Sequence, residues 1–202
     1  MHKKSIDKAT ALTKQRRKAA TAIEKEMKER LVPLGIPKVR FSIAIDEKPL
    51  SQNGGDKVSF LFSANTSTEM RPVSEIASGG EIARVMLSIK AMISGAVKLP
   101  TIIFDEIDTG VSGKIAEQMG MIMQEMAAGN RQVISITHLP QIAARGTTHY
   151  KVYKEETQKG TVSTMTMLSD DERVQEIAQM LSGSDITDAA ISNAKVLLGH
   201  SR

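Results

Sequence analysis

Two adjacent carboxylates, Asp105 and Glu106, are the residues of this sequence best suited to chemistry. They follow a short run of β-branched and aromatic residues, 101–104, which is entered through Pro100 and predicts a strand buried on both faces. An ionised carboxylate that is buried without a partner costs several kcal/mol. The acidic pair at the end of this strand therefore needs cations or hydrogen-bond donors nearby.

The pair would suit a magnesium-bound phosphate that is attacked by water. One carboxylate would hold the metal's shell, and the other would take a proton from the water. Ligands of open α/β sheets bind at this end of the strands. The alternative is a strand that ends in a solvated acidic turn, and short motifs often match by chance.

A second motif, Ser78-Gly79-Gly80-Glu81, opens a predicted helix. Ser78 and Glu81 fit a capping box, which is an ordinary helix start. A cap does not explain two consecutive glycines, which lower helix propensity and let backbone N–H groups approach an anion closely. The serine hydroxyl, the glycine amides and the helix dipole could together hold a phosphate.

His138 follows a second predicted strand, Gln132–Ile136. A predicted helix from Lys114 to about Ala128 separates this strand from the first. Strand, helix and strand in this order imply a right-handed crossover between neighbouring parallel strands. His138 should therefore emerge at the same sheet edge as the carboxylates, which favours a site residue over a capping or core histidine.

A long charged helix is predicted over residues 5–31, which lack Gly and Pro. Its narrow apolar seam is typical of the end of a coiled coil whose partner strand lies elsewhere. The members of the seam are Ala9, Leu12, Ala19, Ile23, Met27 and Leu31. The basic cluster Lys14, Arg16, Arg17 and Lys18 could bind DNA phosphates, although such a run is usually a solvated face.

The other predicted elements are two hairpins and two C-terminal helices. Their expected ranges are strands 39–45 and 58–63, strands 150–154 and 161–167, and helices 171–181 and 186–198.

The composition sets the broad class. With 202 residues, 41% hydrophobic and 25% charged, the chain can hold one soluble domain, or one domain with an appendage. No apolar run is long enough to cross a membrane. The absence of cysteine excludes disulfides and thiolate metal sites, so the cytoplasm is the expected compartment.

The charge and the histidines narrow the binding classes. A net charge of +4 permits contact with nucleic acid, while 3% aromatic residues argue against a base-stacking platform. Any DNA contact should be to phosphates. No structural zinc is predicted, because the histidines lack ligand spacing; they are His2, His138, His149 and His200.

The three motifs together resemble an ABC-type ATPase head, in which the signature motif, Walker B motif, D-loop and switch histidine occur in this order. ASGGEIARVMLSIK, TIIFDEIDTGVSG and ITHLPQIAA are similar, nearly residue for residue, to the motifs of SMC-like proteins of bacterial DNA double-strand-break repair. The resemblance begins at about Ala11. It implies an α/β fold: a partial P-loop NTPase (ABC-type) head lobe with a mainly parallel sheet flanked by helices. Residues 1–34 would end a coiled-coil arm, and residues 35–202 would form the C-terminal lobe.

The resemblance also implies roles for the chemical residues. Asp105 would hold the magnesium shell through nucleotide and water, Glu106 would orient and deprotonate the attacking water, and His138 would sense the γ-phosphate. A second head would hold the ATP contacted by the signature motif, which comprises Ser78, Gly79, Gly80 and Glu81. The D-loop would cross the interface between the heads with Asp108, Gly110, Ser112 and Gly113.

One essential part of such a head is missing from the sequence. The only Gly-Lys pair, Gly113-Lys114, has Asp108 where a P-loop has its first Gly and Ile115 where it has Ser or Thr. In this family the P-loop lies in an N-terminal half beyond a long coiled coil. The chain is therefore expected to be the C-terminal half of the head, inactive towards ATP and Mg²⁺ without the other half.

The implied partners are the N-terminal half of the same head, a second head in an ATP-dependent homodimer, and DNA, in a cytoplasmic, nucleoid-associated protein. Two alternatives stay open. A DNA-binding or self-association module would make no catalytic use of the carboxylates. The nucleotide-binding subunit of a transporter is disfavoured by the missing P-loop, the Lys/Glu-rich start and Glu81.

Overall fold

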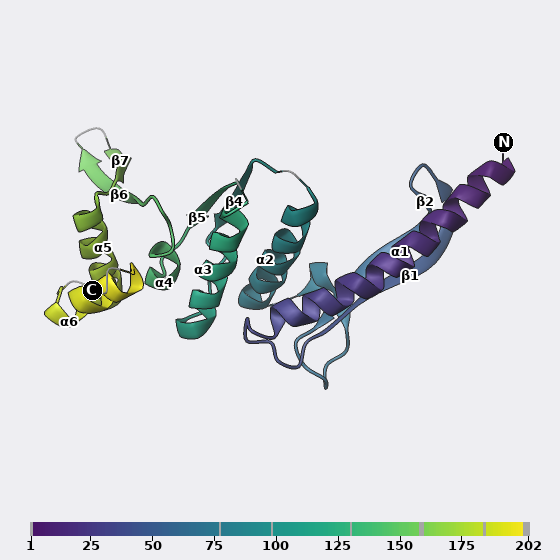
Figure 1. The fold of residues 1–202 in the computed structure, drawn as a ribbon, viewed down its shortest axis with the longest axis horizontal. Helices are drawn as coiled ribbons and strands as arrows, with labels where there is room; N and C mark the ends of the chain where they lie inside the picture. Colours follow the sequence, from purple (N-terminus) through teal and green to yellow (C-terminus); the bar gives the residue numbers. More distant parts are fainter. Residues whose placement is uncertain are drawn as a thin grey trace. The chain divides into compact units, whose positions relative to one another are not determined.

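The computed structural model describes residues 2–76, 78–97, 99–129, 131–157, 160–183 and 185–199. The chain divides into two compact units, Met1–Ala96 and Val97–Arg202. Figure 1 shows the helices and strands of both units in chain order. Within the described ranges, every helix is too short or too polar to cross a membrane.

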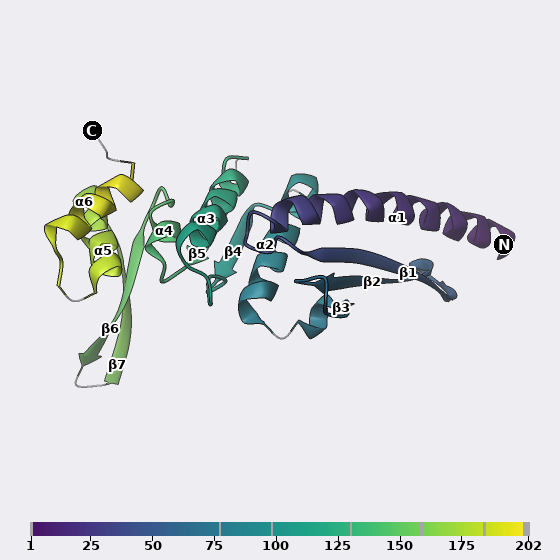
Figure 2. The ribbon, with the colours of Figure 1, turned by 90° about the horizontal axis from the view of Figure 1, so that it is seen from below.

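The first unit combines a long helix with an antiparallel sheet in the order β1-β2-β3. Figure 2 shows α1 running along the β1–β2 hairpin. Its elements are α1 (His2–Leu31), β1 (Arg40–Ser51), β2 (Gly54–Ser63), β3 (Arg71–Pro72), the 3₁₀ turn η1 (Val73–Glu75) and α2 (Gly79–Ala96).

The β1–β2 pair confirms the predicted hairpin and extends it. Ser51 lies opposite Gly54, so residues 52 and 53 form the connection. Gly54 has a φ of +89°, a left-handed conformation that suits glycine. A side chain there would also lie 3.0 Å from Leu12 of α1, so the hairpin tip approaches the helix closely. So short a connection joins only antiparallel strands, which is the pairing predicted for these two strands.

The seam of α1 faces this hairpin. Ala20 is buried and Ala19 is exposed, so the predicted seam was wrong by one residue at that turn. The Glu24 carboxylate accepts a hydrogen bond of 2.7 Å from the backbone N–H of Ile43 in β1. The described part of the helix therefore has a packing partner in this chain, and a coiled-coil arm over residues 1–34 stays a prediction.

A buried carboxylate also joins α1 to the hairpin. Asp56, 6% exposed, lies with its two oxygens 2.8 and 2.9 Å from the Thr13 hydroxyl. Arg16 donates to Asp56 at 2.8 Å and to the carbonyl of Asn53 at 2.8 Å. We call Thr13, Arg16 and Asp56 the helix clamp.

The second unit contains the predicted strand–helix–strand motif, which is confirmed: β4 and β5 pair in parallel, with Ile103 opposite Ile134. A separate hairpin and two helices follow. The elements are β4 (Thr101–Asp105), α3 (Gly113–Ala127), β5 (Gln132–Ile136), α4 (Pro140–Ala143), β6 (Tyr150–Thr157), β7 (Gly160–Met167), α5 (Asp170–Ser182) and α6 (Asp188–Leu197).

Only one face of the β4–β5 pair is covered by the described residues of this unit. Ile102 and Phe104 are buried on the face that carries α3. On the other face Ile103, Ile134 and Ile136 are 55%, 40% and 51% exposed. The prediction that β4 is buried on both faces is thus wrong for the described chain, because a two-stranded sheet with one covering helix leaves its second face bare. We call these three isoleucines the bare row.

The C-terminal helices form a small core of their own in the second unit. The capping box at Ser169 and Glu172 begins α5. The buried residues that α5, α6 and the end of α4 share are Ala144, Val174, Ile177, Ala178, Ala190 and Ala194. Both predicted C-terminal helices are present, and they pack on each other through this core.

Candidate active site

The carboxylate pair lies at the end of the β4–β5 ladder. Asp105 is the last residue of β4 and lies opposite Ile136, the last residue of β5. The backbone N–H of Glu106 donates to the carbonyl of Ile136 at 3.1 Å, which carries the ladder one residue further. Both carboxylates are exposed. Since Phe104 points into the core, Asp105 lies on the same face as the bare row.

Glu106 has a strained backbone. Its φ is +47°, and among the described residues no other non-glycine residue has a positive φ. This left-handed conformation costs roughly 1–2 kcal/mol for a residue with a Cβ. The Thr109 hydroxyl donates to the Glu106 carbonyl at 3.0 Å and braces the turn. Such strain gathers at functional sites, where the surroundings enforce it.

Asp108 is buried beneath the turn that follows β5. It is 1% exposed, and its Oδ2 accepts a hydrogen bond from the Thr137 hydroxyl. The Thr137 oxygen in turn accepts from the backbone N–H of Leu139 at 3.0 Å. The Nδ1 atom of His138 lies 3.5 Å from Asp108 Oδ1. The structure thus brings His138 to the sheet edge of the carboxylates, with its ring beside the Asp108 carboxylate.

The predicted D-loop residues form the turn between Asp108 and α3. The backbone N–H of Val111 donates to the Asp108 carbonyl at 3.3 Å. Gly110 and Gly113 have φ values of +78° and +54°, so both need glycine's freedom. Ser112 occupies the N-cap of α3, and its side chain makes no capping hydrogen bond within the described chain. Its exposed hydroxyl is available to a partner.

The signature motif lies in the first unit, where it begins α2. The Ser78 hydroxyl accepts a long hydrogen bond of 3.4 Å from the Glu81 N–H, which is a weak cap. A Cβ at Gly79 would meet no described atom within 4 Å, so the packing of the described residues does not require glycine there. Arg84 donates to the carbonyls of Gly80 and Leu34, both at 2.8 Å, and ties this helix start to the core.

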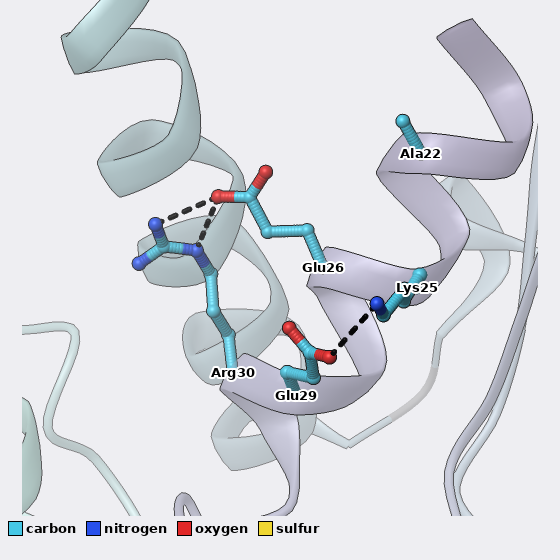
Figure 3. Close-up of a pocket in the computed structure, with 5 residues that line it drawn as sticks. All are labelled: Ala22, Lys25, Glu26, Glu29 and Arg30. Atoms are coloured by element: carbon cyan, nitrogen blue, oxygen red, sulfur yellow. Dashed lines mark hydrogen bonds and ion pairs between the residues drawn. The ribbon is translucent and has the colours of Figure 1, made fainter. Parts of the chain in front are cut away.

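The basic cluster of α1 divides into two kinds of residue. The Arg16 guanidinium is bound to Asp56 in the helix clamp, whereas Lys14, Arg17 and Lys18 are exposed. A shallow hollow elsewhere on α1 is lined by two pairs of opposite charge one turn apart, Lys25–Glu29 at 3.9 Å and Arg30–Glu26 at 2.7 Å (Figure 3). Exposed pairs of this kind contribute little and contain no catalytic group.

Two features of the site were missed from sequence. The burial of Asp108, which was assigned to the D-loop, was not predicted, and Thr137 was not singled out at all. The sequence signal was the Thr137-His138-Leu139 turn, in which a threonine hydroxyl accepts from the N–H two residues on. Of the histidines considered for zinc, His200 and the side chain of His2 lie outside the described residues.

Comparisons with known proteins give one consistent result. No family model matches the sequence. The chain is 37% identical over 192 residues to the DNA repair protein RecN of Haemophilus influenzae, covering 94% of this chain and 34% of that protein. It is 41% identical over 169 residues to RecN of Bacillus subtilis, covering 80% of this chain and 29% of that protein. The chain thus spans about a third of the length of these relatives.

The fold has a match among solved structures. The Smc head domain with a coiled coil and joint from Pyrococcus yayanosii is similar with a TM-score of 0.61 and 21% identity, over 80% of this chain and 29% of that one. The described α/β units with their N-terminal helix therefore have part of the fold of an Smc head domain.

Proposed function

This chain is a relative of the RecN DNA repair proteins, and from that premise we propose that it is the C-terminal half of an ATPase head. The head would bind and hydrolyse ATP during recombinational repair of DNA double-strand breaks. The P-loop would come from an N-terminal half, since the sequence of this chain contains none. Alone, the chain would neither hold ATP tightly nor hydrolyse it.

One observation carries the proposal: Asp105 ends one of two neighbouring parallel strands, Glu106 follows it, and His138 follows the end of the other strand. The Glu106 N–H bonds to Ile136, and His138 comes two residues after Ile136. A strand edge of this kind is where α/β sheets bind their ligands. The strain at Glu106 adds support, because the chain holds this carboxylate in a conformation that local preferences oppose.

The donor set fits magnesium bound together with a nucleotide. Among the described residues no three His, Asp or Glu side chains gather to hold a metal alone. Mg²⁺ usually keeps several waters and is bound through one or two carboxylates and substrate phosphates. Asp105 would contact this shell. When bound, the ion would neutralise charge that develops on the phosphates.

The chain's own residues would then act on the water and the phosphate. Glu106 would orient the attacking water and accept its proton, as a positioned general base. His138, with 65% of its side chain exposed, would reach the γ-phosphate region. Catalysis of phosphoryl transfer depends largely on such positioning and on charge stabilisation.

A second head would complete the site. The proposed contacts to its ATP come from the signature motif, where Ser78 is exposed and Gly79 leaves room for close approach. Asp108 and Ser112 belong to the turn proposed to cross that interface, with the exposed Ser112 hydroxyl as its contact. The N-terminal half of the head would cover the bare row, because exposed apolar surface is stabilised by burial.

DNA is the remaining partner in the proposal. The proposed location is therefore the cytoplasm, at the nucleoid. Lys14, Arg17 and Lys18 are exposed cations that could bind phosphates. They also favour the second candidate function, a DNA-binding or self-association module without catalysis. That module would show salt-dependent duplex binding that is unaffected by changes at Asp105, Glu106 and His138.

The test pairs this chain with the P-loop half of a RecN relative. Glu106→Gln should lower ATP turnover by about a hundredfold or more while ATP stays bound, because the amide keeps the shape and loses the base. Filter binding and phosphate release measure the two effects. Glu125→Gln, on the exposed side of α3, is the matched control and should turn over ATP normally. Undiminished turnover by Glu106→Gln would remove Glu106 from the mechanism.

A further inference from the structure

Asp108 is a buried carboxylate with one oxygen unused. Its side chain is 1% exposed, and Oδ2 receives the Thr137 hydroxyl. Oδ1 is buried, and within the described chain no donor makes a hydrogen bond to it. Buried polar atoms are nearly always paired, because leaving one unpaired forfeits its hydration. Asp108 Oδ1 therefore needs a hydrogen-bond donor among the groups that lie near it.

Two donors of the turn that follows β5 are already used. The single hydroxyl proton of Thr137 is directed to Oδ2, and the N–H of Leu139 is directed to the Thr137 oxygen. The atom that faces Oδ1 is His138 Nδ1, at 3.5 Å. An ionised carboxylate can only accept hydrogen bonds, so a stable contact requires a proton on Nδ1. Hydrogen bonds of catalytic groups are often long before substrate binds and tighten afterwards.

We infer that Asp108 is a positioning residue, which holds the His138 ring with its proton on Nδ1 and with Nε2 turned outward. The consequence for turnover rests on the proposed ATPase function, but the placement of the proton does not. A neutral ring in this form presents a lone pair at Nε2 and accepts a hydrogen bond from water. As long as Nδ1 keeps its proton beside the Asp108 carboxylate, the ring can donate from Nε2 to a phosphate oxygen only when it is doubly protonated.

This arrangement also links two loops of the site. Asp108 begins the turn that continues through Val111 to α3, and its carbonyl accepts the Val111 N–H at 3.3 Å. A displacement of that turn would move the carboxylate that orients His138. Contact between a second head and this turn would therefore change the orientation of the His138 ring, even if the second head did not contact His138 itself.

The test reads the ring directly, on the complete chain without nucleotide. Long-range ¹H–¹⁵N spectra distinguish the two neutral tautomers of histidine, and His138→Gln identifies the signals of His138 among the four histidines. Spectra are recorded at a pH where the ¹⁵N shifts show a single proton on the ring. The wild-type ring should be protonated on Nδ1. Asp108→Asn should move the proton towards Nε2 in most of the molecules.

Asp185→Asn makes the same chemical change at an exposed position of the second unit and should leave the His138 signals unchanged. A wild-type His138 protonated on Nε2 would overturn the inference, even if Asp108→Asn failed to fold. A folded Asp108→Asn with the wild-type tautomer would overturn it as well.

A second readout separates the inference from the proposed function. In the paired head, Asp108→Asn should lower kcat about tenfold or more with little change in KM, an effect of the size seen when a metal-ligating histidine loses its carboxylate partner. The Nδ1 tautomer together with an inactive paired head would refute the ATPase proposal and, with it, the consequence for turnover. An active head whose His138 is protonated on Nε2 would refute the role of Asp108 alone.

Discussion

Each unit buries one aspartate, and the two aspartates are used in opposite ways. In the first unit Asp56 has both oxygens beside the Thr13 hydroxyl and one of them on Arg16. The Arg16 hydrogen bond, followed by that of Thr13, holds the pKa of Asp56 below its ordinary value. The carboxylate thus favours the folded state and fixes α1 to the hairpin.

In the second unit the more deeply buried Asp108 has a hydroxyl on one oxygen and a distant imidazole beside the other. Two residues before it, Glu106 has a strained φ. Satisfied polar groups stabilise a fold, whereas partly satisfied groups and strain weaken it and persist where function requires them. The difference therefore separates a structural contact from a candidate site more clearly than burial does.

The largest expected effect comes from changing the two aspartates to asparagine. Asp56→Asn should weaken the first unit, because Arg16, only partly exposed, loses its countercharge. Asp108→Asn should leave the stability of the second unit unchanged or raise it, because it removes a poorly paired buried charge. Amide hydrogen exchange in β1 and β2, compared with β4 and β5, measures each unit separately.

The exposed Asp46→Asn in β1 controls for the chemical change in the first unit. Equal loss of protection in both units would end the distinction between the two aspartates.

A smaller effect is expected from relieving the strain at the site. Glu106→Gly should raise the free energy of unfolding of the second unit by roughly 0.5–1 kcal/mol, the left-handed penalty less the entropy cost of glycine. Hydrogen exchange in β4 and β5 measures it. Asp185→Gly, where φ is not positive, should instead be neutral or destabilising. A destabilised Glu106→Gly would contradict the inference of strain.

The smallest effect is a difference in acid sensitivity. Burial is the main cause that lowers the pKa of His149 from its ordinary 6.5; Arg173 and Lys151 lower it further, and Glu176 opposes them. When the pKa of a group is lower in the folded state than in the unfolded state, that group stabilises the fold at pH values above its unfolded pKa. This contribution is lost as the pH falls through the folded pKa. The second unit should therefore weaken as the pH falls below about 6.5.

The contribution of Asp56 should persist until the pH falls below the ordinary aspartate value of 3.8, because its pKa is lowered too. Hydrogen exchange of both units at several pH values checks the order. His149→Gln should remove the earlier loss from the second unit. If the first unit weakens first, the two groups do not govern acid sensitivity.

The sequence was sufficient where neighbours along the chain decide the structure. The parallel pair β4–β5 and the helix between them follow from apolar runs and turn residues, and Gln132–Ile136 was predicted with its observed bounds. The hairpins were found from their glycines, although β1 extends to Ser51, beyond the predicted end at residue 45. Local pattern is informative there because pairing partners are close in sequence.

Local pattern failed where a partner is distant in sequence. Arg16 belongs to a basic cluster, but its guanidinium is paired with Asp56, forty residues later in the sequence. Asp108 was assigned to the D-loop from its motif, but its burial and its hydrogen bond with Thr137, twenty-nine residues away, were not predicted. No periodicity reports such contacts, because burial of a single polar residue is decided by the tertiary fold.

The bare row has a consequence for the life of the polypeptide. One face of the β4–β5 pair exposes apolar side chains to water, those of Ile103, Ile134 and Ile136. Exposed apolar surface of this kind promotes self-association as the protein concentration rises. Burial of this face by a partner would therefore affect the amount of folded protein as well as its activity.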